Sequence, residues 1–270
     1  VLGGIRLIKV VVCGAYGKMG RAVLNAVHND SDLMLVGAVD VMSKGDDIGS
    51  LIGIDKIGIN VKKDLQEVLT ETSADVVVDF TNPNVVMNNI RIILKNRVYP
   101  VVGTTGLIDE NKKEIEQLCK ENNVGAFIAP NFAIGAVLMM KLSQEVAKYM
   151  PDVEIIELHH DQKLDAPSGT ALRTAELISE VRGMRTQGHP DEVEKIKGAR
   201  GSDFDGIHIH SVRLPGYVAH QEVIFGGLGQ TLTIRHDSIN RDSFMPGVVI
   251  ACKKVVSLDT LVCGLENILN

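Results

Sequence analysis

The order of apolar and polar positions in the first half of the chain alternates between two kinds of segment. Short runs of β-branched residues predict buried strands, and apolar residues recurring every three or four positions predict helices. The predicted strands are 5–13, 33–39, 76–80, 100–102 and 125–129, and the predicted helices are 21–28, 64–70, 81–95 and 109–122. Strands that alternate with helices form right-handed βαβ units, so we expect an α/β fold with a doubly wound parallel sheet.

The pattern changes in the second half of the chain. A long helix is predicted first, then a strand, a further helix and a polar, glycine-bearing excursion; the ranges are 132–149, 153–158, 170–181 and 183–203. Antiparallel strands separated by glycine turns follow, and helical spacing then returns to the end of the chain; these ranges are 207–213, 217–225, 229–236, 242–256 and 261–269. This half therefore predicts an α+β domain with a mixed or antiparallel sheet.

A glycine-rich loop, Gly14–Gly20, connects the first predicted strand to the first predicted helix. Glycine lets the backbone approach a pyrophosphate closely, and the helix N-terminus supplies N–H donors. The spacing is GxxGxxG rather than GxGxxG, so a turn without a ligand remains the alternative. Asp40 ends the next strand, about 20 residues later, where an acid accepts hydrogen bonds from ribose hydroxyls. Together these features predict a dinucleotide site.

The charge around Asp40 bears on which dinucleotide binds. Its carboxylate would repel a ribose 2′-phosphate, and Val41 offers no compensating charge. We therefore expect NADH to be preferred over NADPH, although Lys44 is close enough in sequence to soften the preference. Ligands of parallel sheets bind at the carboxyl ends of the strands, which adds three segments to the predicted site: Phe80–Thr81, Gly103–Thr105 and Ala129–Phe132.

The residues that point most directly to chemistry lie between 157 and 171. His159, His160 and Lys163 share one short loop, and imidazole and amine groups transfer protons near neutral pH when their surroundings tune them. Ser168–Thr170 opens the next predicted helix, whose N-terminal N–H groups form an anion site. The alternative is a polar turn in which Ser168 only caps the helix.

Composition limits the classes of function. The chain has 270 residues, of which 45% are hydrophobic and 23% charged, and a net charge of −6, which argues against a nucleic-acid partner. Its longest apolar run, 132–140, is too short to cross a membrane, and the N-terminus lacks the order of a signal peptide. The four cysteines form no CxxC pair, so we expect buried thiols in a reducing cytoplasm. His208 and His210 share a strand face without a third ligand at obvious spacing, so no metal is expected.

The segment 157–171, ELHHDQKLDAPSGTA, resembles the signature of the dihydrodipicolinate reductase family. The resemblance extends over essentially the whole chain, because Gly14–Gly20 has the glycine spacing of that family and Asp79–Thr81, Gly103–Thr105 and Ala129–Phe132 match its cofactor-side segments in order. It implies reduction of 4-hydroxy-tetrahydrodipicolinate, through dihydrodipicolinate, to tetrahydrodipicolinate in lysine and diaminopimelate biosynthesis.

The resemblance also implies a domain division and an assembly. Residues 1–131 would form a Rossmann domain that binds the dinucleotide, and residues 132–240 a domain for substrate binding and oligomerisation. Residues 241–270 would return to the Rossmann domain as helices, with Arg241 near the cofactor or the hinge. The family is usually a homotetramer joined through the sheets of its substrate domains, and we expect a homotetramer here.

Roles for individual residues follow from the same resemblance. His159 and Lys163 would transfer protons, His160 would orient the substrate, and Ser168, Gly169, Thr170 and Thr105 would hold its carboxylates. NADH, or NADPH, would contact Gly14, Ala15, Tyr16, Gly17, Lys18, Met19, Asp40, Gly103, Thr104, Thr105, Ala129, Pro130, Asn131 and Phe132.

Two rival functions are compatible with a dinucleotide site. One is a reductase for another small acid, against which the His159–His160–Lys163 signature argues. The other is a redox sensor that binds NADH and signals through its assembly. A sensor has no need of proton donors beside an anion site, and it would bind the cofactor without turnover.

Overall fold

The computed structural model describes residues 6–269, so the predicted first strand residue, Ile5, lies outside the described part. The chain divides into two compact units. The first unit comprises Val1–Phe132 and Phe244–Asn270, and the second comprises Ala133–Ser243. The C-terminal segment therefore returns to the first unit, which holds the glycine-rich loop.

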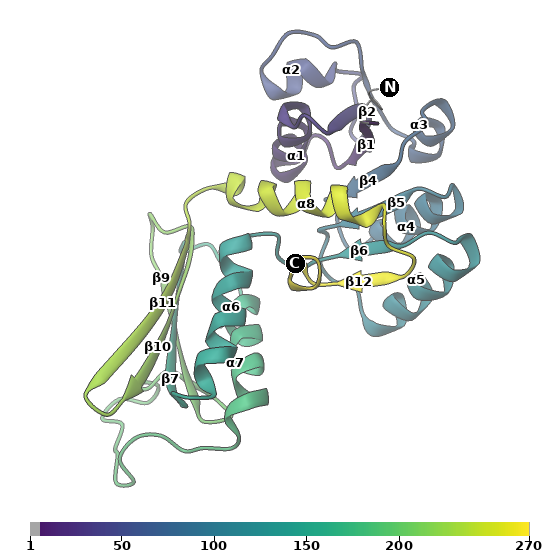
Figure 1. Ribbon diagram of the computed structural model, residues 1–270. Helices are drawn as coiled ribbons and strands as arrows, with labels where there is room; N and C mark the ends of the chain where they lie inside the picture. The colour runs from purple at the N-terminus through teal and green to yellow at the C-terminus, as the bar shows by residue number, and fades with distance from the viewer. Residues whose placement is uncertain (1–5, 270) are drawn as a thin grey trace. The chain divides into compact units, whose positions relative to one another are not determined.

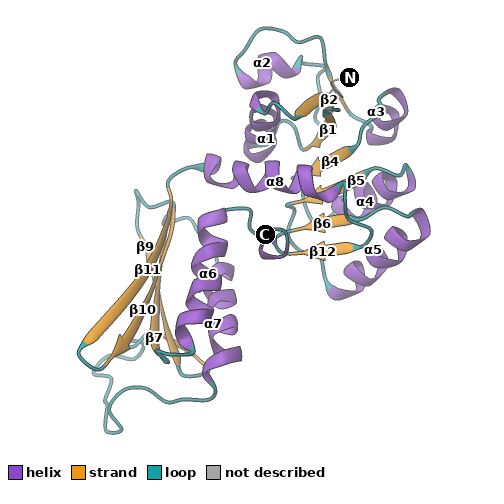
Figure 2. Ribbon diagram, in the orientation of Figure 1, coloured by secondary structure: helices purple, strands orange, loops and turns teal. Residues whose placement is uncertain are grey.

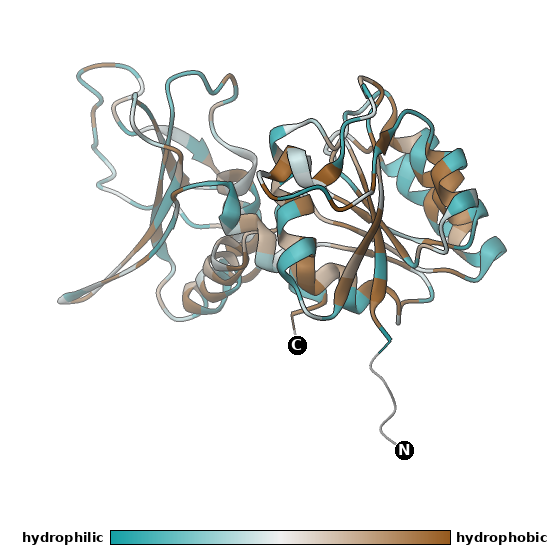
Figure 3. Cartoon of the chain, turned by 90° about the horizontal axis from the view of Figure 1, so that it is seen from above, coloured by the Kyte–Doolittle hydropathy of each residue, from teal (hydrophilic) through white to brown (hydrophobic). Residues whose placement is uncertain are grey.

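The first unit is built on a seven-stranded sheet in the order β12-β6-β5-β4-β1-β2-β3, with parallel pairing throughout. Its strands are β1 (Ile8–Cys13), β2 (Leu33–Val39), β3 (Val61–Lys62), β4 (Val76–Asp79), β5 (Tyr99–Val102), β6 (Ala126–Ile128) and β12 (Leu261–Cys263). Central strands are hydrophobic along most of their length (Figure 3), because both faces are covered. The predicted doubly wound parallel sheet is confirmed.

Helices cover both faces of this sheet (Figure 1). On one face α1 (Lys18–Asn29) contacts α8 (Met245–Val255), and α1 also contacts the short α2 (Ile48–Ile52). On the other face α3 (Leu65–Glu71), α4 (Val86–Lys95) and α5 (Asp109–Asn122) contact one another in series. In α4 the buried residues Val86, Ile90 and Ile93 recur at helical spacing, so one side of the helix packs on the sheet.

Three local predictions about this unit are wrong. The predicted helix 261–269 is instead the edge strand β12 and a short 3₁₀ turn, Leu265–Asn267, because Leu261–Cys263 pairs with β6 and Gly264 has a positive φ of 89°. No helix was predicted between Asp40 and Asp64, where the structure has the short α2. The helix expected from Thr81 begins at Val86, after a turn in which Asn82 accepts hydrogen bonds from two backbone N–H groups.

The second unit is a five-stranded mixed sheet with two helices on one of its faces (Figure 2). The order is β11-β10-β7-β9-β8, in which only β7 and β9 pair in parallel. Its elements are α6 (Ile134–Ala147), β7 (Asp152–His159), α7 (Gly169–Arg182), β8 (Ser202–Phe204), β9 (Ile207–Arg213), β10 (Ala219–Gly227) and β11 (Gln230–Ser238). The strand β8 was not predicted, since it lies in the polar excursion.

Alternation along β7 decides which side chains face the helices. Val153, Ile155 and Glu157 are buried, whereas the residues between them are half-buried. His159, the last residue of the strand, is half-buried but lies on the same face by alternation. The glutamate and the histidine therefore project to the same side as α6 and α7.

Candidate active site

The glycine-rich loop of the first unit is held too tightly for side chains at two positions. Gly14 has φ of 82°, and a Cβ there would lie 2.5 Å from the carbonyl oxygen of Phe80. A Cβ on Gly20 would lie 2.0 Å from the carbonyl oxygen of Gly14. The backbone N–H of Gly17 donates to the same Gly14 oxygen at 3.0 Å. The loop is thus fixed as a tight turn at the N-terminus of α1, the form that accepts a pyrophosphate.

Asp40 follows β2 and is tied to the glycine loop. Its two carboxylate oxygens accept hydrogen bonds from the backbone N–H groups of Tyr16 and Met42, both at 2.9 Å. The Tyr16 hydroxyl in turn donates to Asp46 at 2.5 Å and accepts from the N–H of Lys44 at 2.9 Å. The ribose-acid candidate and the phosphate-loop candidate are therefore one connected structure.

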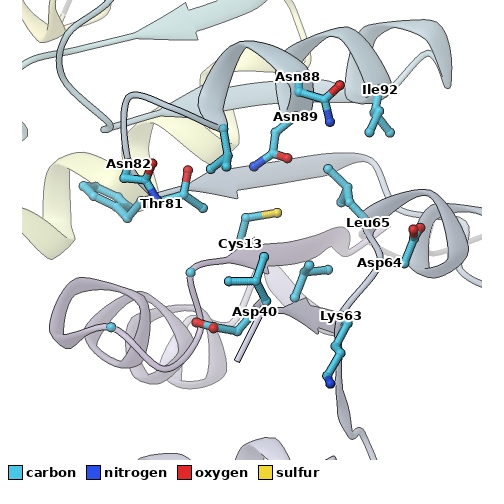
Figure 4. Close-up of a pocket in the computed structure, with 16 residues that line it drawn as sticks. Cys13, Asp40, Lys63, Asp64, Leu65, Thr81, Asn82, Asn88, Asn89 and Ile92 are labelled. Atoms are coloured by element: carbon cyan, nitrogen blue, oxygen red, sulfur yellow. The ribbon is translucent and has the colours of Figure 1, made fainter. Parts of the chain in front are cut away.

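A cavity of about 400 Å³ opens beside this structure (Figure 4). Gly14, Gly17 and Asp40, which are among the predicted dinucleotide contacts, line it. Asp40 and Lys63 lie on one side of it and the α4 residues Asn88 and Asn89 on the other. Sequence reasoning did not find the following lining residues: Lys63, Asp64, Leu65, Asn82, Val85, Asn88, Asn89 and Ile92.

Asp79 at the end of β4 joins two of the other predicted segments. This fully buried carboxylate accepts hydrogen bonds from the hydroxyls of Thr81 at 2.7 Å and Thr104 at 2.8 Å, and from the amide of Asn89 at 2.7 Å. Thr81 and Thr104 follow neighbouring strands, so one buried acid fixes the loops at the carboxyl ends of both.

The remaining cofactor candidates occupy different environments. Ala15 and Phe132 are buried, and Phe132 packs against Phe80 with ring centroids 5.7 Å apart. Gly103 leaves room for the same Phe80 ring, since a Cβ there would lie 2.1 Å from it. The exposed or half-buried candidates are Lys18, Met19, Thr105, Pro130 and Asn131. Packing therefore explains Ala15, Gly103 and Phe132 without a ligand contact.

The second unit brings His159 against a buried carboxylate. Nδ1 of His159 lies 2.5 Å from Oε2 of Glu157, and both side chains come from the helix-facing side of β7. The guanidinium of Arg213, on the adjacent β9, donates to both oxygens of Glu157 at 2.8 and 2.6 Å. Burial by itself would raise the pKa of Glu157, but hydrogen bonds from His159 and Arg213 lower the pKa to about 2.

The anion-site candidate lies at the start of α7. Ser168 is its N-cap, and the Ser168 hydroxyl accepts from the N–H of Ala171 at 3.2 Å. The capping role of Ser168, which the sequence offered as the alternative, is thus present, and Gly169 and Thr170 form the first turn of α7. A Cβ placed on Gly169 would meet nothing within 4 Å, so this end of the helix is open to a ligand.

Lys163 and His160 lie on the loop between β7 and α7. Nζ of Lys163 is 2.6 Å from Oδ1 of Asp165, and its backbone N–H donates to the carbonyl of His160 at 3.2 Å. His160 is exposed and follows the last residue of the strand, so strand alternation does not set its direction. The loop thus places His160, Lys163 and Ser168 within one short segment that starts at His159.

Other expectations concern metal and membrane. Among residues 6–269, no group of three or more histidine, cysteine, aspartate or glutamate side chains could hold a metal ion. His210 instead pairs with Glu154, with 2.8 Å between Nε2 and Oε2. No helix in the described part of the chain is long and apolar enough to span a bilayer.

Comparisons with known proteins cover nearly the whole chain. Residues 8–132 match the family model described as dihydrodipicolinate reductase, N-terminus, and residues 135–269 match the model of the C-terminus. The 4-hydroxy-tetrahydrodipicolinate reductase of Desulfitobacterium hafniense (strain DSM 10664 / DCB-2) is 59% identical over 98% of this chain and 100% of its own. That of Halalkalibacterium halodurans is 56% identical over 97% and 100%.

A solved structure agrees with these sequence matches. The dipicolinate-bound dihydrodipicolinate reductase from Paenisporosarcina sp. TG-14 superposes with a TM-score of 0.88 at 48% identity, covering 97% of this chain and 100% of that one. An amine dehydrogenase from Mycobacterium smegmatis shares the fold alone, with a TM-score of 0.68 at 17% identity.

Proposed function

The chain belongs to the dihydrodipicolinate reductase family, and we propose the following account of its reaction and of the residues that carry it out. It is an NAD(P)H-dependent oxidoreductase that reduces 4-hydroxy-tetrahydrodipicolinate, through dihydrodipicolinate, to tetrahydrodipicolinate in lysine and diaminopimelate biosynthesis. The observation that carries the residue assignment is His159 held by a buried glutamate at the end of β7, on the same segment as Lys163 and the open N-terminus of α7.

The glycine loop and its cavity fit a nicotinamide dinucleotide. Gly14 and Gly20 allow a tight turn that a Cβ would prevent, and Asp40 lines the cavity with a carboxylate. The residues that would hold the cofactor are those of the loop, Gly14–Met19, with Asp40, Gly103–Thr105 and Ala129–Phe132. When bound, the reduced nicotinamide supplies the hydride.

NADH is proposed as the preferred cofactor. The Asp40 carboxylate lines the cavity, and Val41 beside it also lines the cavity without bringing a positive charge. Lys63 is the cation on the same side of the cavity, and it moderates the repulsion of a 2′-phosphate. We therefore expect NADPH to be accepted, with lower efficiency than NADH.

His159 and Lys163 are proposed to handle protons at the substrate. Because Glu157 is ionised, Nδ1 of His159 carries a proton and donates it in a hydrogen bond to that carboxylate, which leaves Nε2 to exchange a proton with the substrate. Lys163, paired with Asp165, carries a positive charge to the same loop. Hydride addition leaves negative charge on the substrate ring, and a protonated group here quenches it.

The carboxylates of the substrate are assigned to the start of α7. The N–H groups of Gly169 and Thr170 and the hydroxyls of Ser168 and Thr170 are donors of the kind that bind a carboxylate at a helix N-terminus. His160 is proposed to orient the substrate from the loop, and Thr105 is proposed as a further carboxylate contact. The relative from Paenisporosarcina, with dipicolinate bound, binds a ligand of this dicarboxylate class.

The assembly is proposed to be a cytoplasmic homotetramer. Helices α6 and α7 lie on one face of the five-stranded sheet, and the other face carries half-buried Ile156, Leu158 and Ile224. Contact between such faces of two copies would bury these side chains. Light scattering that gives a monomer mass over a wide concentration range would reject this part of the proposal.

The test of the proposed reaction is a turnover assay. Substrate is generated in situ from pyruvate and aspartate semialdehyde by a coupling synthase, and oxidation of NADH and NADPH is followed in parallel. We expect turnover with both and higher kcat/KM with NADH. His159→Ala should lower kcat by about 10²–10⁴-fold, whereas His189→Ala, on the exposed excursion, should leave it unchanged. Cofactor binding without turnover would favour the sensor.

A further inference from the structure

Glu157 is an ion buried among donors that come from three segments: its own strand β7, the start of α7 and β9. Its side chain has no solvent exposure, and its Oε2 is 2.5 Å from Nδ1 of His159. Its Oε1 accepts from the backbone N–H of Ser168 at 3.2 Å. Arg213 donates to both oxygens, and the nearby Ser211 hydroxyl also helps to lower the pKa of this carboxyl. A buried carboxylate is stable only when it is satisfied in this way.

The partners of Glu157 belong to both halves of the proposed substrate site. His159 is the proton-transfer candidate, and Ser168 is the N-cap of the helix assigned to the substrate carboxylates. Arg213 also donates to the backbone carbonyl of Asp165 at 2.8 Å, which fixes the loop that carries Lys163. The Glu157 carboxylate and the Arg213 guanidinium therefore fix His159, the loop that carries Lys163 and the start of α7 relative to one another.

We propose that Glu157 is the positioning residue of this site: it holds His159 as the Nδ1–H form, with Nε2 turned to the substrate, and it ties His159 to the carboxylate-binding turn of α7. This inference rests on the proposed function for the identity of the substrate. The orientation of His159 itself rests only on the geometry of the second unit.

The two hydrogen bonds from Arg213 explain why the arrangement holds one orientation. They engage both oxygens of Glu157, so the plane of the carboxylate is fixed and Oε2 stays directed at His159. An ionised carboxylate accepts hydrogen bonds and does not donate them, so the nitrogen facing it must carry the proton. When Nε2 of His159 gives up its proton, the ring returns to the neutral Nδ1–H form without rotating.

A second cluster on the same strand provides a matched control. Glu154 also pairs with a histidine and an arginine: Oε2 lies 2.8 Å from Nε2 of His210, and Oε1 accepts from Arg200 at 2.6 Å. Glu154 lies on the opposite face of β7, away from α7. It shares the residue types of the Glu157 cluster but has no contact with the proposed substrate site.

Glu157→Gln tests the proposal because the carboxylate accepts hydrogen bonds at both oxygens, whereas the amide of glutamine has one acceptor oxygen and one donor NH₂ group. Arg213 and the Ser168 N–H both need an acceptor at the Oε1 position, so the amide oxygen is expected there and the NH₂ group faces His159. Nδ1 of His159 must then accept a hydrogen bond, which moves the proton of the neutral ring to Nε2 and disfavours the imidazolium. We expect kcat to fall by about 10²-fold or more with little change in KM, and the imidazolium-dependent limb of the kcat–pH profile to be lost.

A carboxylate restored at this position should recover part of that loss. Glu157→Asp keeps the charge but is shorter by one methylene, so its kcat should lie between those of the wild type and Glu157→Gln. Glu154→Gln should retain the wild-type kcat and pH profile, with the oligomer mass measured to show that the assembly is unchanged. Equal losses in Glu157→Gln and Glu154→Gln would reduce the effect to general stability and overturn the proposal.

NMR of the histidine ring nitrogens separates this proposal from the proposed reaction. Among the eight histidines of the chain, the signals of His159 are assigned by their loss in His159→Gln. The proposal requires Nδ1–H in the neutral wild-type ring and Nε2–H in Glu157→Gln. Neutral Nε2–H in the wild type would overturn it even if Glu157→Gln did not fold. Nδ1–H in a wild type that shows no turnover would leave the positioning intact and reject the reaction.

Discussion

Removing the charge of Asp40 tests the electrostatic basis of the proposed cofactor preference. Asp40→Asn keeps the size of the side chain and one acceptor oxygen. The carboxylate now accepts from Tyr16 and Met42, and the amide can keep one of these hydrogen bonds. Loss of the other costs about 0.5–1.5 kcal/mol, but it affects NADH and NADPH binding equally. The ratio of the two cofactors therefore isolates the effect of charge on the 2′-phosphate.

The size of that effect follows from the position of Asp40. Two unit charges about 5 Å apart repel by about 0.8 kcal/mol in a water-like medium and about 3 kcal/mol at the effective dielectric of a protein surface. Asp40 is half-buried, its cavity is open to solvent, and Lys63 lies on the same side, so we take the lower part of this range. A penalty of about 1–2 kcal/mol corresponds to about 5- to 30-fold in the cofactor ratio.

The assay is kcat/KM for NADH and NADPH in the wild type, Asp40→Asn and Asp55→Asn. Asp55 is an exposed acid that does not line the cavity, so its replacement makes the same change in net charge without altering the site. We expect Asp40→Asn to shift the ratio toward NADPH by about 5- to 30-fold, and less at high salt. An unchanged ratio would refute the electrostatic reasoning, and a wild type that favours NADPH would refute the proposed preference itself.

Three further predictions follow from packing, charge and burial. Gly20→Ala places a Cβ 2.0 Å from the carbonyl oxygen of Gly14. Urea denaturation should show that the free energy of unfolding falls by about 1–3 kcal/mol, and NADH binding should weaken. Gly226→Ala, whose Cβ would have its nearest neighbour at 4.0 Å, should change neither quantity. The pKa of Glu157 falls from 4.5 to about 2 on folding. Its ionisation therefore stabilises the fold by about 3 kcal/mol above about pH 4.5, and this contribution is lost as the pH falls toward about 2. In Glu157→Gln the free energy of unfolding should vary less over this pH range. Exposed Cys263 should react with a thiol reagent in the native state, while the three buried cysteines should react only after unfolding; burial raises the pKa of all four thiols, so access rather than thiol pKa makes the difference.

The parallel sheet and its glycine loop could be predicted because their signals are local. The run Ile8–Cys13 is apolar at every position except Lys9, so both faces of the strand are largely apolar, and the loop that follows it needs glycine for backbone reasons. The wrong prediction at the C-terminus has a local cause as well. Leu261–Cys263 is too short for its period to distinguish strand from helix, and only the exposed edge of β6 decides the matter.

The far wall of the cavity could not be predicted, because helix rotation sets it. Asn88 and Asn89 lie in a segment whose helical period was recognised, but the period identifies only the side that packs on the sheet. Asn89 faces the cavity region because its amide donates to Asp79 at the end of β4. That contact depends on how α4 is placed over the strand, which no nearby residue in the sequence indicates.

The proposed positioning of His159 illustrates a different limit. Alternation along β7 is sufficient to place Glu157 and His159 on one face, so half of the arrangement is readable in the sequence. Arg213 is 56 residues further along the chain from Glu157, and it reaches the carboxylate only because β9 pairs with β7 in parallel, opposite His159. The turns after β9 and β10 predicted antiparallel neighbours, and the parallel pairing inserts β7 between β9 and β10. Strand order, rather than any motif, thus places an arginine against the buried acid at the end of β7, so that its charge is neutralised and it can hold the proton donor. A sequence motif that contains His159 and Lys163 omits the arginine on which their placement depends.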